Sequence, residues 1–169
     1  MNKKADVFDA LDAAAPTLRR YARALCAGAG AAFADDCVQN ALQGLAGRIR
    51  DRELSVANAE EARLEAYAAL TALAGRRAAA APPPGPRHPP IVHGLAALAF
   101  EDRAVLLLVS LEGYSYEAVA RIIGVSRETA LLRLRRARAA LSVAGEKGGS
   151  SHHADIEARR AAAHLRIVK

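Results

Sequence analysis

The chain of 169 residues has no tryptophan and only two cysteines, and its seven aromatic residues are four Tyr and three Phe. Two cysteines are too few for the disulfide framework of a small secreted domain, so Cys26 and Cys37 are expected to be buried thiols. No apolar run reaches the roughly 18 residues that a membrane-spanning helix needs. Residues 1–12 also lack the pattern of a signal peptide. We therefore expect a cytoplasmic protein that does not insert into a membrane.

Sequence motifs of catalysis are missing as well. There is no glycine-rich phosphate loop, no nucleophile elbow and no cysteine pair at zinc spacing. His152, His153 and Asp155 lie in a glycine- and serine-rich stretch that offers a metal no rigid frame. We expect no catalytic residue, no metal site and no cofactor, and the protein is not expected to be an enzyme.

What the chain does contain favours helices. Ala, Leu, Arg and Glu are strong helix formers, and the alternation typical of strands is nearly absent. The expected fold class is all-α. The formal net charge of +6 fits a partner that carries phosphates or an acidic surface.

Proline divides the chain into two modules. Six of the seven prolines fall within residues 78–90, where they exclude a regular helix and predict a semi-extended linker. We expect a helical bundle at residues 1–77, a Pro-rich linker at 78–94, a second helical module at 95–144, and a flexible hinge with a basic tail at 145–169.

The first module is expected to hold three helices with apolar stripes. The first contains Pro16, which predicts a break or a fresh start. The second is expected to open near Asp35 and Asp36, whose carboxylates suit the positive end of a helix. The third is expected from about residue 58 to residue 77.

The second module has the pattern of a helix-turn-helix. A helix at 101–111 ends before Gly113, Ser115 is placed to cap a helix at 116–123, and Gly124 turns the chain. Ser126 then caps a final helix that runs to about residue 143. A short helix, a glycine turn and a longer helix are what a DNA-binding helix-turn-helix requires.

The final helix separates an apolar side from a basic side. Ala130, Leu134, Ala137 and Leu141 repeat at helical spacing and predict a buried stripe. The expected DNA-binding residues lie outside this stripe: Ser126, Arg127, Glu128 and Thr129 within reach of base edges, and Arg133, Arg135, Arg136 and Arg138 within reach of phosphates. The alternative interpretation is an arginine-rich face that only contacts solvent.

These residues carry a resemblance to a known family. The stretch from Glu112 to Arg138 resembles the fourth conserved region of extracytoplasmic-function (ECF) sigma factors, the module that reads the −35 promoter element in that family. Output domains of response regulators share this fold. The stretches 18–25 and 34–42 resemble the second region of the same factors. That resemblance implies that Asp35, Asp36, Gln39 and Asn40 bind core RNA polymerase, although the family often has an acid where Asn40 stands.

The resemblance implies an ECF sigma factor whose partners are core RNA polymerase, promoter DNA and an anti-sigma factor. Two departures keep other functions open. The stretch 64–75, where the family reads the −10 element, has lost most of its basic and aromatic residues, and Tyr67 stands where a tryptophan is usual. Leu131 and Leu132 also lie off the buried stripe, where they suit a protein groove better than DNA.

Those departures favour two alternatives. One is a sigma-like mimic that captures an anti-sigma factor through Leu131 and Leu132 without driving transcription, as in some bacterial stress regulators. Such regulators usually carry a receiver domain, for which this chain has neither the length nor the strands. The other is a DNA-binding regulator of a different kind.

Overall fold

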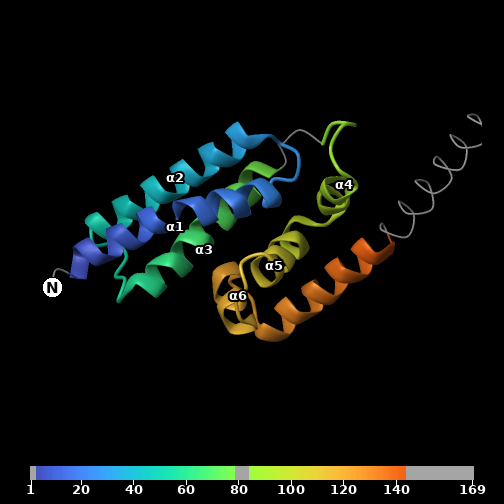
Figure 1. The fold of residues 1–169 in the computed structure, drawn as a ribbon. Helices are drawn as coiled ribbons and strands as arrows, with labels where there is room; N and C mark the ends of the chain where they lie inside the picture. Colours follow the sequence, from blue (N-terminus) through green and yellow to red (C-terminus); the bar gives the residue numbers. More distant parts are fainter. Residues whose placement is uncertain (1–2, 79–83, 144–169) are drawn as a thin grey trace, which may run out of the picture.

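A computed structural model describes residues 3–78 and 84–143 of the chain. These residues form seven helices and no strand, which confirms the all-α fold (Figure 1). The expected basic tail at 145–169 and part of the expected linker, residues 79–83, lie outside the described residues. Among the described helices, none is both long and apolar enough to cross a bilayer.

The first module is a bundle of three long helices: α1 (Lys3–Leu25), α2 (Ala31–Arg50) and α3 (Ala59–Arg77), which all pack against one another (Figure 1). Each helix turns one apolar stripe inward. Leu18, Leu45 and Leu70, one from each helix, are buried. The amide of Glu61 donates to the side chain of Asn58, which caps α3.

Two expected boundaries in this module are wrong. Helix α1 runs unbroken through Pro16, because Ala14 and Leu18 on either side are both buried and hold the two halves of the helix on one core. Helix α2 begins at Ala31, four residues before Asp35, behind a Gly30 cap whose φ is 92°. The carboxylates expected to cap α2 therefore lie further along the helix, where they pair with arginines.

The second module consists of α4 (Pro90–Ala97), α5 (Phe100–Ser110), α6 (Tyr116–Ile123) and a final helix at residues 127–143, which we call helix 127–143. Helix α4 occupies residues that were expected to belong to an extended linker. Pro90 is the first residue of that helix, where an amide hydrogen would have no helical partner and proline costs little. Residues 90–94 are thus helical and not part of an extended linker.

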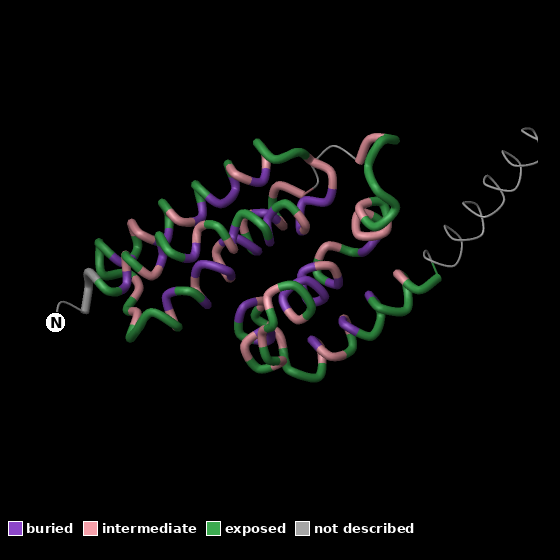
Figure 2. Tube along the Cα trace, viewed as in Figure 1, coloured by how far each residue is buried: buried purple, intermediate pink, exposed green. Residues whose placement is uncertain are grey.

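The two modules are packed against each other. Helix α5 contacts α1 and α3, and α6 lies along α3 (Figure 1). The buried apolar residues of the two modules form one continuous core, and the exposed residues lie on the outer sides of the helices (Figure 2). At Gly75 the modules approach so closely that an added Cβ would lie 3.0 Å from the Phe100 ring. Helix 127–143 packs against this shared core along one side only, so its opposite side is free.

Candidate nucleic-acid interface

The corner between α6 and helix 127–143 is built as its sequence predicts. Ser115 caps α6, accepting a hydrogen bond from the amide of Ala118 at 3.2 Å. Gly124 ends α6 in the left-handed conformation with φ 69°, which a residue without Cβ adopts readily. The Ser126 hydroxyl then accepts from the amide of Thr129 at 3.2 Å and caps the next helix. Two helices therefore meet at a tight, capped bend.

The apolar side of helix 127–143 faces the module. Ala130, Leu134 and Ala137 are buried and Leu141 is partly buried, which confirms the predicted stripe and fixes the register of the helix. On a helix of 3.6 residues per turn, the side chains opposite this stripe project away from the protein.

The predicted DNA-binding residues lie on the free part of the helix surface and at its capped start. Arg127, Arg135, Arg136 and Arg138 are exposed, and Arg133 is half-buried. Ser126 and Glu128 are exposed, and Thr129 is half-buried. The structure therefore brings these residues together on one helix, with its N-terminal turn at the outer corner of the module.

Two of the five arginines are engaged by carboxylates of the same module. Arg127 pairs with Glu117 of α6 at 2.7 Å, and Arg136 pairs with Asp102 of α5 at 3.2 Å. Among the described residues, Arg133, Arg135 and Arg138 have no carboxylate partner. Three cations without a partner on one helix make a surface that attracts a polyanion.

The acids near the corner remain charged at neutral pH. Hydrogen bonding to a backbone amide, with smaller contributions from Arg127 and Ser115, lowers the pKa of Glu117. A backbone hydrogen bond and the Ser126 hydroxyl likewise lower the pKa of Glu128. Glu117 therefore competes with any anion for Arg127, while Glu128 is a free hydrogen-bond acceptor of the kind that suits a cytosine amino group.

The two leucines predicted to contact a protein are placed differently. Leu132 is 57% exposed, whereas Leu131 is only half-buried at the edge of the packed side. Helical spacing puts Leu132 between Glu128 and Arg135, at the centre of the free face. A large apolar side chain in that position is unusual for a surface that contacts only phosphates.

The residues predicted to bind polymerase lie together on α2. Gln39 and Asn40 are exposed, Asp36 is exposed and Asp35 is half-buried. Asp35 pairs with Arg23 of α1 at 3.0 Å, and Asp36 pairs with Arg77 of α3. The Asn40 amide donates to the Asp36 carboxylate at 3.0 Å. The hydrogen bond from Arg77 is the main reason why the pKa of Asp36 is lowered.

Tyr67 is not at the surface. The sequence placed it in a stretch that reads DNA in the resembled family, yet it is only 1% exposed and its ring lies against those of Tyr21 and Tyr114. Sequence reasoning also missed Glu112 and Arg103, which contact the first module. Neither has a local signal, because their partners lie far away along the chain.

The two cysteines are buried and free, as predicted. Burial, with a smaller contribution from Cys37, raises the pKa of the Cys26 thiol to about 12, so this thiol is a poor nucleophile at neutral pH. Within the described ranges, no group of three or more metal-ligating side chains occurs.

Comparison with known proteins found a family match for the second module. Residues 90–141, less than half of the chain, match the family model described as sigma-70, region 4. This region is a DNA-binding domain of transcription factors and not an enzyme family. Searches among curated proteins and among solved structures gave no match.

Proposed function

We propose, on the premise that residues 90–141 form a sigma-70 region 4 module, that the protein is an ECF-type sigma factor acting in the cytoplasm. In this proposal helix 127–143 binds the −35 promoter element and the first module binds core RNA polymerase. The observation that carries the proposal is the capped corner with three unpartnered arginines beyond it.

The geometry of helix 127–143 supports a role in reading DNA. In a helix-turn-helix the second helix enters the major groove with its N-terminal residues at the base edges. Ser126, Arg127, Glu128 and Thr129 occupy that end of the helix, and the arginines from 133 to 138 follow it at positions suited to phosphates. Arg127 would have to leave Glu117 in order to contact a guanine.

The polymerase contact is proposed for α2. Its Gln39 and Asn40 side chains are exposed, the latter donating to Asp36, whereas Asp35 and Asp36 are held by arginines of α1 and α3. Because both ion pairs are largely exposed, a partner with its own arginines can exchange with them at little cost. An anti-sigma factor is proposed to cover Leu131 and Leu132.

One observation favours a second candidate, the sigma-like mimic. The α3 stretch that would meet melted DNA is covered by the second module, and an exposed leucine occupies the centre of the face that would meet duplex DNA. Both features suit a protein that presents a closed, partly apolar surface to an anti-sigma factor in place of one that opens promoters.

Transcription with purified core polymerase and a library of promoter fragments separates the candidates. Promoter-specific transcripts that are lost in Arg127→Ala or Arg133→Ala, and kept in the control Arg48→Ala of the first module, support the sigma factor. If core polymerase stays inactive with the protein while an anti-sigma factor binds it and Leu132→Glu abolishes that binding, the mimic is correct. If the Arg127 and Arg133 variants bind DNA as wild type does at moderate salt, the DNA role is wrong.

A further inference from the structure

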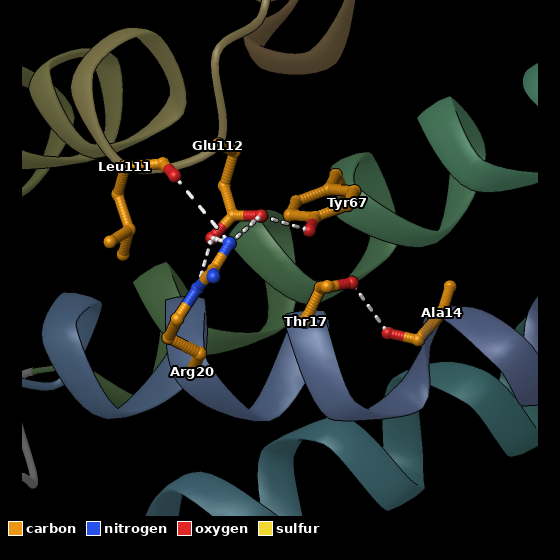
Figure 3. A network of polar contacts seen from close by, with 6 residues as sticks. All are labelled: Ala14, Thr17, Arg20, Tyr67, Leu111 and Glu112. Carbon is orange, nitrogen blue, oxygen red and sulfur yellow. Dashed lines mark hydrogen bonds and ion pairs between the residues drawn. The ribbon is translucent and has the colours of Figure 1, made fainter.

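The contact between the modules is centred on one buried carboxylate. Glu112 follows α5, and its side chain is only 4% exposed. Arg20 of α1 donates to both carboxylate oxygens, at 3.0 and 3.1 Å, and Tyr67 of α3 donates its hydroxyl hydrogen at 2.6 Å (Figure 3). A single side chain of the second module is thus held by two helices of the first.

The contact between the modules depends on Arg20, the cation that pairs with Glu112. A buried carboxylate needs an opposite charge or several hydrogen bonds, and losing the cation leaves it with an uncompensated charge. Arg20 is itself 54% exposed, so removing its side chain takes little packing from α1. Burial and the Glu112 carboxylate raise the pKa of Tyr67, which keeps its hydroxyl protonated as a donor.

A second polar contact lies at the other end of the interface. Arg103 of α5 donates to the carbonyl of Leu25, the last residue of α1, at 2.7 Å. It also donates to the carbonyls of Ala96 and Leu98 in its own module, at 3.1 and 3.0 Å. A cation at the end of a helix is favoured by the helix dipole, and none of these partners is a carboxylate.

We propose that Glu112, Arg20 and Tyr67 form a clasp that holds the two modules closed, and that release of Arg20 opens them and uncovers the α3 face that carries Tyr67. The clasp joins segments that are otherwise linked by a proline-rich connection. Opening also separates the part of the shared core that lies between the modules. Each module has buried stripes and helix caps of its own, so we expect both to stay folded when the interface opens.

Closure has a consequence for nucleic-acid binding, and this consequence rests on the proposed function. Glu60 and Glu61 of α3 line one hollow together with Arg121 of α6. In a helix-turn-helix the first helix lies across the phosphate backbone. Two carboxylates beside Arg121 weaken the attraction of that helix for phosphates, so opening is expected to increase affinity for DNA several-fold.

The test compares two neighbouring arginines of α1 in the full chain. Arg20→Ala removes the cation of the clasp, whereas Arg19→Ala removes the same charge at an exposed position with no carboxylate partner among the described residues. Tetranitromethane, which modifies accessible tyrosines, reports the state of the interface when the nitrated sites are found by mass spectrometry. Tyr67 reports opening, and Tyr21, whose hydroxyl bonds Thr71 of the first module, reports loosening of that module.

We expect Arg20→Ala to raise the nitration rate of Tyr67 about tenfold, because an uncompensated buried charge shifts the closed-to-open equilibrium by about that factor. Tyr21 should stay unreactive and the radius of gyration in solution scattering should increase. Adding Glu112→Gln to Arg20→Ala should restore protection of Tyr67, since the amide keeps an acceptor for the hydroxyl and removes the charge. Arg19→Ala should behave as wild type.

The clasp is refuted if Arg20→Ala and Arg19→Ala give the same nitration of Tyr67, or if Tyr21 becomes reactive together with Tyr67. Binding to a DNA duplex at low salt is measured on the same variants. An opened Arg20→Ala protein that binds DNA no better than Arg19→Ala refutes the inhibitory consequence. If no variant binds DNA, the proposed function fails, and the nitration result still decides whether the clasp exists.

Discussion

The acids of α2 in the first module and the arginines of helix 127–143 in the second differ in how many of them form ion pairs. In the first module the acids of α2 are paired with arginines of neighbouring helices, Asp35 with Arg23 and Asp36 with Arg77. In the second, helix 127–143 carries five arginines, and the described carboxylates engage only two of them. The acids of α2 are therefore compensated by neighbouring helices, whereas helix 127–143 carries an excess of positive charge.

The difference follows from how the helices are packed. Helices α1, α2 and α3 lie side by side, so a charged residue on one reaches an opposite charge on the next. Helix 127–143 packs along one stripe and lies at the edge of the second module (Figure 1). Its outer side has no neighbour to supply carboxylates, which leaves that side available to a polyanion.

The strongest way to break this comparison is to remove the unpartnered cations. Replacing Arg133, Arg135 and Arg138 together by Ala should reduce affinity for promoter DNA about a hundredfold or more and lower the salt dependence by roughly three counterions. Fluorescence anisotropy over a range of salt concentrations measures both. The control replaces three exposed arginines of the first module, Arg19, Arg48 and Arg50. An equal loss in the control would mean that only net charge matters.

Two glycines, Gly124 at the corner and Gly44 inside α2, test whether the corner requires a left-handed backbone conformation. Gly124 has φ 69° with open space at its Cβ position, so Gly124→Ala should destabilise the protein by about 1 kcal/mol through backbone strain alone. Gly44 lies within α2, also with open space, and Gly44→Ala should stabilise by about 0.5–1 kcal/mol. Urea unfolding measures both, and a change of the same sign in the two variants would contradict the prediction.

At the corner, Arg127 pairs with Glu117 as the acids of α2 pair with arginines in the first module. Breaking this pair should increase the difference in unpaired positive charge between the two modules. Glu117→Gln releases Arg127 and is expected to increase DNA affinity a few-fold, since no charge then competes with the nucleic acid. Glu101→Gln, at an exposed position in α5, makes the same change of net charge. Equal gains in the two variants would show that pairing is irrelevant.

The smallest effect is expected where both partners are exposed. The lowered pKa of Asp36 means that its pair with Arg77 stabilises the fold above the ordinary value of 3.8, and that this stabilisation is lost as the pH falls through the lowered pKa. Asp36→Asn should therefore be slightly less stable than wild type at pH 7 and equal to it in strong acid. Urea midpoints at the two pH values measure the difference. A gap that widens in acid would mean that another group is responsible.

Several features of the fold could be predicted because they are encoded within a few residues. The caps at Ser115 and Ser126 and the turn at Gly124 depend on side chains at fixed spacing from a helix end. The stripe around Leu134 needs only helical periodicity. All of these are present in the structure.

The boundaries that were predicted wrongly are those where packing prevails over local preference. Pro16 lies inside α1 because the buried residues on both sides hold the helix straight. Helix α2 begins before its two acids, and α4 occupies residues whose composition favours an extended chain. In α1 and α2 burial stabilises a helix that the local residues alone leave uncertain. Helix α4 has no buried residue, and its first position is one that tolerates proline.

The sequence by itself determined the last three helices of the second module, its capped corner and the arginine side of helix 127–143, because these depend on interactions between residues close together in the chain. Only the tertiary structure decided that the modules pack together, that Tyr67 is buried and that Glu112 is held by Arg20. Those two residues are separated by 92 positions. No periodicity or spacing connects them, and the shared core of the two modules brings them within hydrogen-bonding distance.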